Sequence, residues 1–240
     1  MSRNTIRVRH AVAACILLAV AAVPAHAWGG YEETATREIK GFDRVSLEVS
    51  GELILTQGDA ETLDIQASPS ALSRIVTEVR QRTLHISKDP ATPPPAGPVT
   101  YRLTMKSVAG LETNSSGSIR AENIGADALR IAIHSSGGIT VDSLLASSLD
   151  VEISSSGDCT LSGQVDRQTV RVSSSGTYRA GKLSSREARI QVTSSGESTV
   201  RVLEILDVLI SSSGNVRYYG SPPRITSRIT SSGRLMRLGD

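Results

Sequence analysis

The chain has 240 residues, of which 39% are hydrophobic, 21% charged and only 3% aromatic, and its formal net charge is +2. This length allows one or two domains with a sizeable core. With so few aromatic side chains, a surface that stacks the bases of single-stranded nucleic acid or an aromatic cage for sugars is disfavoured. Without Arg3, Arg7 and Arg9, which lie in a segment that we expect to be removed, 23 basic residues face 24 acidic ones, and a net charge of −1 argues against nucleic-acid or anionic-membrane binding.

Residues 1–27 have the three parts of a secretory signal peptide. The three arginines precede an apolar run over residues 11–23, and Ala25 and Ala27 supply the small residues of a cleavage site. The apolar run is too short for a comfortable membrane span, and most of it follows Cys15, which disfavours lipidation there. We therefore expect an exported bacterial protein, periplasmic or at the cell surface, with no integral membrane span after signal removal.

Residues 28–36 are expected to form a linker, and residues 37–88 a leading β segment that caps the rest of the chain. Apolar and polar residues alternate over 45–49, 53–55, 63–65, 76–79 and 84–86, which predicts strands. Residues 70–75 predict one helical turn that Ser70 caps. Residues 89–98 contain five prolines and predict a stiff, exposed loop.

Residues 99–240 contain a repeat of about twenty residues. Ser-Ser-Gly recurs seven times, and successive glycines are separated by 20, 20, 19, 20, 18 and 19 residues. Aliphatic residues dominate the positions six and four before each glycine and are frequent two and four after it, with polar or mixed residues between them. The glycines are Gly117, Gly137, Gly157, Gly176, Gly196, Gly214 and Gly233.

Alternation with period two on both sides of a fixed corner predicts two short strands per unit, each with one buried face. One unit is too small to bury that face alone, so neighbouring units must stack with like residues over like. The prediction is an all-β fold, a single-stranded parallel β-helix of 18–20-residue coils, and right-handed crossovers are the strong default. Ile133, Ile153 and Val172 should then form one file.

The Ser-Ser-Gly corner has a structural interpretation. Glycine accepts the left-handed backbone that a sharp corner can require. By parity the first serine of each pair should point inward and build an internal ladder of hydroxyls. A nucleophilic role is disfavoured, because seven equivalent serines cannot each have a base within reach. These first serines are Ser115, Ser135, Ser155, Ser174, Ser194, Ser212 and Ser231.

The leading segment and the serial corners together resemble a known bacterial family. The residues that carry the resemblance lie at 41–45 (Gly-Phe-Asp-Arg-Val), 55–59 (Leu-Thr-Gln-Gly-Asp) and 84–86 (Leu-His-Ile), followed by the Ser-Ser-Gly units. They are similar to the putative autotransporter adhesin head GIN domain, a domain of unknown function, over roughly residues 37–235. The resemblance implies a right-handed β-helix in an exported protein, with adhesion proposed from architecture, and it brings no catalytic residue to carry over.

The best acidic pair is Asp158 and Glu197, each one residue after a corner glycine. They should lie two coils apart, roughly 10 Å by strand spacing, at the edge of the separation of ~6.5–9.5 Å in inverting glycosidases. The rest of that column, which includes Thr177, indicates a solvated corner instead. Glu152 and Arg171 occupy one outward column and should form a surface ion pair.

The sequence offers no metal or cofactor site. His85 and His134 stand in unrelated positions and are expected at the solvated surface, and neither a calcium-binding nonapeptide nor a phosphate-binding glycine loop is present. Cys159 is the only cysteine after the signal segment, and its place in an aliphatic column predicts a buried, unpaired thiol. We therefore expect no catalytic, cofactor-binding or metal-binding residue.

Three classes of function remain open. The first is a non-catalytic secreted or envelope module that presents a regular face to a glycan or to an envelope or host protein. The second is a β-helical polysaccharide lyase or hydrolase, for which the sequence supplies only the acidic pair above. The third is a structural envelope protein that self-associates, which an uncapped last coil around Leu235 and Leu238 would favour.

Overall fold

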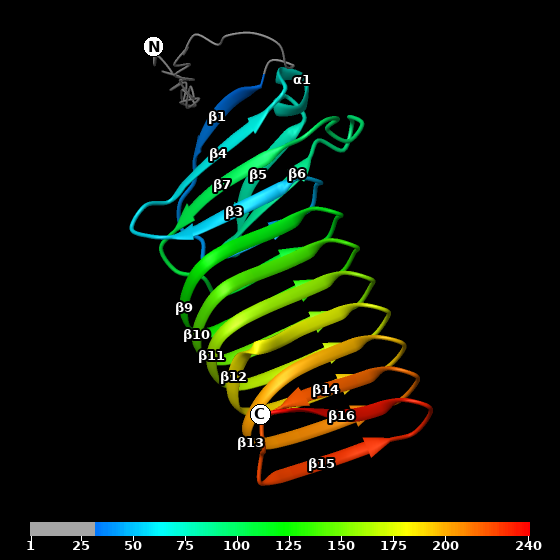
Figure 1. The fold of residues 1–240 in the computed structure, drawn as a ribbon. Helices are drawn as coiled ribbons and strands as arrows, with labels where there is room; N and C mark the ends of the chain where they lie inside the picture. Colours follow the sequence, from blue (N-terminus) through cyan, green and yellow to red (C-terminus); the bar gives the residue numbers. More distant parts are fainter. Residues whose placement is uncertain (1–31) are drawn as a thin grey trace, which may run out of the picture.

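A computed structural model describes residues 32–240, so the predicted signal peptide and residues 28–31 of the predicted linker lie outside the described residues. In the described part sixteen strands join into one hydrogen-bonded sheet that winds along the molecule, with a single short helix near its amino-terminal end (Figure 1). No helix among residues 32–240 combines the length and apolar character of a membrane span. The predicted all-β solenoid is confirmed.

Long, bent strands form the regular coils, and each runs from one Ser-Ser-Gly corner to the next. Neighbouring coils pair in parallel, as the repeat predicts. The strands of this part are β8 Gly110–Thr113, β9 Ser118–Ile133, β10 Gly138–Ile153, β11 Asp158–Val172, β12 Thr177–Val192, β13 Glu197–Ile210, β14 Asn215–Tyr219, β15 Arg224–Ile229 and β16 Arg234–Gly239.

Equivalent positions of successive units lie directly over one another. Ile133 is the register partner of Ile153, which is the partner of Val172, and the file continues into the next two coils. All three side chains are buried, as are most residues of the other predicted inward columns. Packing of these aliphatic files, together with the parallel ladders, therefore holds the coils together.

The coils of β9 to β12 have two bends each in addition to the Ser-Ser-Gly corner, so each has three short segments where the repeat predicts two. The inward–outward alternation breaks twice in β9, at Glu122–Asn123 and at Asp127–Ala128, where two residues in a row are exposed. The segments between the bends stack into a narrow third side, the lateral face, formed by residues 123–127, 143–147, 162–166 and 182–186. The register shifts that absorb unequal unit lengths fall at or beside this face.

The corner glycines are required for close packing and not for a left-handed backbone, which corrects our prediction. None of the seven has a positive φ. A Cβ atom on Gly157 would collide with the Cγ2 methyl of Ile133 and would lie 2.6 Å from the carbonyl oxygen of Gly137 and 2.8 Å from that of Ser135. The corner glycine thus faces inward, where the previous coil leaves no room for a side chain.

The predicted ladder of inward serine hydroxyls is wrong. In the corners at Ser115 and Ser135 the first serine is half-buried, the second exposed, and the glycine is the buried residue. Ser115 donates to the carbonyl oxygen of Val49 at 2.7 Å and accepts from the N–H of Gly117 at 3.1 Å. No hydroxyl-to-hydroxyl bond joins the first serines of successive coils within residues 32–240. The first serine and the glycine share the inward parity, and the glycine takes the buried position at the corner.

The leading segment mixes antiparallel strand pairs with parallel strands of the solenoid. Strands β2, β3 and β7 run parallel to the first coils, whereas β1 pairs antiparallel with β4, β4 with β7, and β5 with β6. The elements are β1 Glu33–Glu38, β2 Arg44–Leu47, β3 Glu52–Gln57, β4 Thr62–Ala67, α1 Pro69–Leu72, β5 Ile75–Arg80, β6 Thr83–Lys88 and β7 Thr100–Met105.

Two details of this segment differ from the sequence-based expectation. Residues 33–36 belong to β1, where a linker was expected, because their backbone pairs with β4. The helical turn is capped by Ser68 and not by Ser70: the Ser68 hydroxyl accepts from the N–H of Ala71, and Pro69 occupies the first turn, which needs no backbone donor there. The proline-rich residues 89–98 form no strand or helix, as expected.

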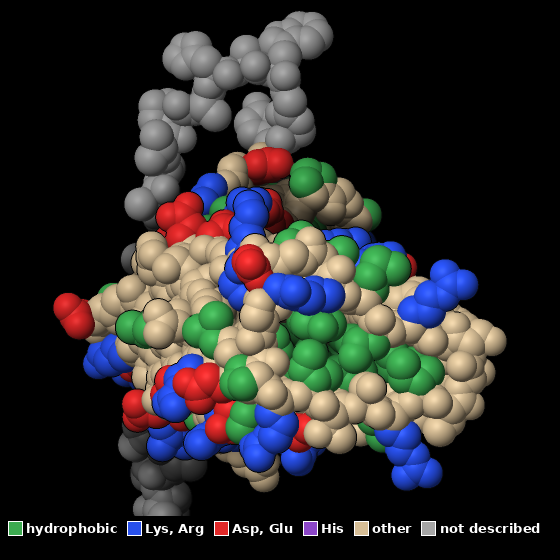
Figure 2. Space-filling view, turned by 60° about the horizontal axis from the view of Figure 1, so that its bottom comes forward, with side chains coloured by type: hydrophobic (Ala, Val, Ile, Leu, Met, Phe, Trp, Pro, Cys, Tyr) green, Lys and Arg blue, Asp and Glu red, His purple; other side chains and the backbone are tan. Residues whose placement is uncertain are grey.

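The two ends of the solenoid differ. At the amino-terminal end the antiparallel strands β1 and β4 and the helix α1 cover the interior, and the core residues Leu63, Ile65 and Ala71 have no exposed surface. At the carboxy-terminal end β15 and β16 form the last coil, and an apolar patch flanked by basic side chains faces the viewer in Figure 2. Every residue of β15 is exposed.

Candidate functional site

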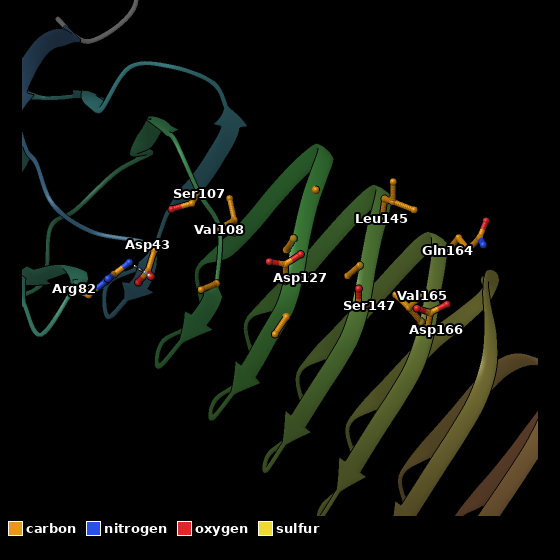
Figure 3. A pocket seen from close by; sticks show the side chains of 15 residues that line it. Asp43, Arg82, Ser107, Val108, Asp127, Leu145, Ser147, Gln164, Val165 and Asp166 are labelled. Atoms are coloured by element: carbon orange, nitrogen blue, oxygen red, sulfur yellow. Dashed lines mark hydrogen bonds and ion pairs between the residues drawn. The ribbon is translucent and has the colours of Figure 1, made fainter.

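An open groove of about 730 Å³, here called the lateral groove, lies on the described surface. It crosses the lateral face of successive coils near the amino-terminal end of the solenoid (Figure 3). Asp127, Leu145 and Asp166 come from three neighbouring coils, and Asp43 and Arg82 close the amino-terminal side. A binding surface that runs along the axis of the solenoid suits an elongated ligand.

Local backbone geometry places Arg82 at one end of the groove. The hairpin between β5 and β6 turns at Gln81 and Arg82, whose φ values are +48° and +63°. Positive φ at both central residues is the two-residue turn that fits twisted hairpins. The turn brings the Arg82 guanidinium to within 2.6 Å of Asp43 Oδ2, while Asp43 Oδ1 is buried without a hydrogen-bond partner.

The remaining groove carboxylates are free of ion pairs. Neither Asp127 nor Asp166 forms a side-chain hydrogen bond or salt bridge within residues 32–240, and Ser147 lies between them on the intervening coil. Two strand spacings put the two carboxylates roughly 10 Å apart. With Asp43 and Arg82 the groove carries three acids and one base, so it offers acceptors to hydroxyl or ammonium groups and disfavours anions.

The two acids of the predicted pair lie in one column with Thr177 between them, as the alignment predicts, but each is bound by an arginine. Asp158 and Glu197 lie two coils apart on another face of the coils, outside the lateral groove. The Asp158 carboxylate accepts from Arg179 at 2.9 Å, and the Glu197 carboxylate accepts from Arg217 at 3.0 Å. Each acid is thus bound by an arginine of the following coil, and neither combines with the other around a common substrate position.

The predicted ion pair between Glu152 and Arg171 is also wrong. The register places the two residues side by side, but the Arg171 guanidinium reaches diagonally to Asp150 at 3.1 Å. Glu152 instead binds Arg130 of the preceding coil at 2.7 Å. The long arginine side chain prefers the diagonal neighbour, which the column alignment alone does not reveal.

The two histidines share one face, although the sequence suggested unrelated positions. His85 Nδ1 lies 2.8 Å from Glu48 Oε1, and His134 Nδ1 lies 2.9 Å from the Ser154 hydroxyl. Polar groups of Ser46, Asn114 and Glu112 continue the chain of hydrogen bonds from Glu48. The last carboxylate oxygen of this chain, Glu112 Oε1, lies 3.9 Å from His134 Nε2, beyond hydrogen-bond distance. Among residues 32–240 no three His, Cys, Asp or Glu side chains converge on a position that could hold a metal ion.

A chain of buried hydrogen bonds crosses the interior of the middle coils. The Tyr178 hydroxyl donates to Gln168 Oε1 at 2.8 Å, the Gln168 amide donates to the Ser185 hydroxyl at 2.8 Å, and Ser185 donates to the carbonyl oxygen of Arg201 at 2.9 Å. Cys159 is buried and unpaired, as predicted, and burial, with the nearby Asp158 carboxylate, raises the pKa of its thiol. These groups are closed to solvent and serve the core.

Sequence reasoning missed the lateral groove. Its residues lie in the variable middle of each unit, far from the Ser-Ser-Gly anchor, and Asp43 and Arg82 come from the segment without repeats. A usable signal was present: Asp127 and Asp166 stand ten and nine residues after their corner glycines, so the alignment nearly matches them. The sequence gives no comparable signal for the bends that place these aspartates on a separate lateral face.

Comparison with known proteins gives one family and several solved structures. Residues 41–222 match the family model described as putative auto-transporter adhesin, head GIN domain. A putative adhesin from Bacteroides fragilis NCTC 9343 is 21% identical with a TM-score of 0.81, and the match covers 87% of this chain and 97% of that one. Comparison with curated proteins gives no significant match.

Two further solved structures share the fold. A putative lipid binding protein from Parabacteroides distasonis ATCC 8503 is 24% identical with a TM-score of 0.71, and a putative adhesin from Parabacteroides merdae ATCC 43184 is 14% identical with a TM-score of 0.63. Each match covers 87% of this chain and 97% of the other. At these identities the likeness establishes the fold alone.

Proposed function

The chain belongs to the auto-transporter adhesin head GIN domain family, and from that membership we propose that it is an exported, non-catalytic adhesin-like module whose lateral groove binds a glycan chain. The observation that carries the proposal is the groove itself, which crosses several coils and presents carboxylates without ion-pair partners in the described chain. Since the family name gives no ligand, we infer the class of ligand from the chemistry of the groove.

A glycan suits the groove better than an anionic ligand does. Asp127, Asp166 and Gln164 line it with oxygen acceptors for sugar hydroxyls, and Arg82 adds a donor at one end. Leu145, which is 66% exposed, offers an apolar surface between the polar groups. A phosphorylated or sulfated polymer would meet more negative than positive charge here, so we expect a neutral glycan or one that bears amino groups.

The non-catalytic part of the proposal rests on the placement of the acids. A glycosidase or lyase needs a protonated acid and a second group aligned across the scissile bond. Asp158 and Glu197 are each bound by an arginine, and Asp127 and Asp166 are set roughly 10 Å apart by two strand spacings. Turnover of a bound glycan would overturn this part and favour the hydrolase alternative.

Residues 28–240 should be tested on an array of neutral, amino-bearing and acidic glycans, with a lipid panel beside it because one solved relative is named a lipid binding protein. We expect binding of neutral or amino-bearing glycans that weakens at least tenfold in the double variant D127N/D166N. The matched control D158N/E197Q changes two carboxylates outside the groove and should bind as the parent does. Glycan binding that survives D127N/D166N, or binding of lipids alone, would contradict the proposal.

Export is tested separately. Expression of the full chain in a Gram-negative host should yield a processed protein whose amino-terminal sequence begins at Trp28, after the predicted cleavage site. Fractionation should place the processed protein in the periplasm or at the cell surface. Unprocessed protein in the cytoplasm would contradict export while leaving the groove test unaffected.

A further inference from the structure

The last coil, formed by β15 and β16, exposes apolar side chains that every other coil buries. The inner files of the preceding coil end in Leu206, Val208 and Ile210, which are buried, and their register partners in β15 are Ile225, Ser227 and Ile229. Ile225 and Ile229 are 43% and 39% exposed. They lie at the carboxy-terminal end of the core, where no further strand of the described chain covers them.

The same coil has two free strand edges. Strand β15 pairs only with β13, and β16 pairs only with β14, so within residues 32–240 the other edge of each strand has no backbone partner. Unpaired N–H and C=O groups on an exposed edge are a template for another strand. They argue against insertion into a lipid bilayer, where such groups would have no partner.

The charge of this coil is one-sided. Arg224 and Arg228 flank the edge on the outer side of β15, and Arg234 stands at the start of β16; none of the three forms a salt bridge within the described residues. Arg237 is bound to Asp240 at 2.5 Å, to the carbonyl oxygen of Gly220 and to Ser221. The exposed edge thus carries Ile225, Ser227 and Ile229 on its inner side and Arg224, Thr226 and Arg228 on its outer side.

A second copy of the chain does not complement this edge. Two last coils joined about a two-fold axis would set arginine against arginine, and like charges on opposed strands destabilise the pair. The amino-terminal edge strand β1 carries Glu33 and Arg37 on the side that faces the core file of Leu63 and Ala67, so stacking it on the open end would bury charges against aliphatic side chains.

We propose that the last coil captures an extended, acidic segment of another protein by adding it as a strand to β15. In the added strand one side would carry aliphatic residues that cover Ile225 and Ile229, and the other side would carry carboxylates beside Arg224 and Arg228. Backbone hydrogen bonds to the free edge would supply affinity, and the alternation of residue types would supply selectivity. This surface lies at the opposite end from the lateral groove and acts independently of it.

The test uses residues 28–240 and three labelled ten-residue peptides, followed by fluorescence anisotropy. The first peptide alternates Val with Glu, the second alternates Val with Lys, and the third repeats the first with N-methyl groups on alternate backbone nitrogens. We expect the acidic peptide to bind, the basic peptide to bind at least tenfold more weakly, and N-methylation to abolish binding. The affinity for the acidic peptide should also fall when the salt concentration is raised from 50 to 500 mM, since salt screens the attraction between the arginines and the carboxylates.

Charge-reversal variants locate the site. R224E/R228E should weaken binding of the acidic peptide at least tenfold. The control R102E/R167E reverses two arginines of β7 and β11 that form no salt bridge within residues 32–240, and it should leave binding unchanged. Far-ultraviolet circular dichroism and melting curves confirm that all variants fold. The proposal would be supported most directly if R224E/R228E bound the basic peptide more tightly than the acidic one.

Four results would overturn the proposal: no binding of the acidic peptide, equal binding of the acidic and basic peptides, equal loss in R102E/R167E, and binding that survives N-methylation. A concentration-dependent doubling of mass that R224E/R228E abolishes would assign the edge to a second copy instead. Binding to phosphatidylglycerol vesicles without binding to the acidic peptide would assign it to a lipid surface. Each outcome leaves the glycan test of the lateral groove untouched.

Discussion

Replacing the corner glycine Gly157 by alanine tests the packing of the coils. The added Cβ would lie 2.6 Å from the carbonyl oxygen of Gly137 and 2.8 Å from that of Ser135, and it would also collide with Ile133. Because two of these neighbours are backbone atoms of the previous coil, rotamer changes cannot relieve the crowding and the coils must separate. We expect a loss of about 2–3 kcal/mol, at the upper end of overpacking costs.

For a chain of this length 1 kcal/mol shifts Tm by about 2–4 °C, so the expected fall is roughly 4–12 °C. The control is Gly125→Ala, a strand glycine without positive φ and with nothing within 4 Å of the added carbon. It should leave Tm unchanged or raise it slightly. Urea unfolding followed by circular dichroism measures both. A Gly157→Ala protein as stable as Gly125→Ala would refute the assignment of the corner glycine to close packing.

Further predictions concern the interior and the surface. Tyr178→Phe removes the donor that satisfies buried Gln168 and should cost about 1–3 kcal/mol in urea unfolding; an unchanged midpoint would show that the amide finds another partner. Cys159 should resist iodoacetamide at pH 8 in the folded protein and react after unfolding, since its pKa is raised and its thiol is buried; rapid labelling of the native state would refute this. The pKa of Glu204 is lowered by its hydrogen bond from Arg186. The stabilisation from this pair is therefore present above the ordinary glutamate pKa and is lost as pH falls through the lowered value. Arg186→Met should raise the pKa of Glu204 in a carboxyl NMR titration, and an unchanged titration curve would show that the pair does not persist in solution.

The regular coils could be predicted because the recurring Ser-Ser-Gly motif aligns all equivalent positions of the repeat. Once the Ser-Ser-Gly glycines are aligned, the file of Ile133, Ile153 and Val172 follows from period-two alternation, and the register confirms it. The same alignment predicted the burial of Cys159. Where the repeat holds, local pattern and global fold agree, so short-range reasoning is sufficient.

Prediction failed where geometry between coils decides the outcome. Whether the first corner serine or the corner glycine faces inward depends on how closely successive coils approach, and the alignment carries no distance. Arg171 could be assigned a column but not the diagonal reach that takes it to Asp150. His85 and His134 lie on one face because β2 pairs with both β6 and β8. The segment up to residue 88 contains no repeat from which this pairing could be predicted.

The uneven unit lengths have a consequence for how this protein can diversify. Gains and losses of residues are absorbed at or beside the bends of the lateral face, between Val141 and Leu144, Thr160 and Ser162, and Ala180 and Glu187, while the opposite edge keeps a constant registration. We therefore expect insertions to be tolerated on the lateral face, which carries the lateral groove, and to be disfavoured at the Ser-Ser-Gly corners. Specificity can drift along one side of the scaffold while the other side preserves the architecture, which also makes the lateral face the natural place to graft foreign loops.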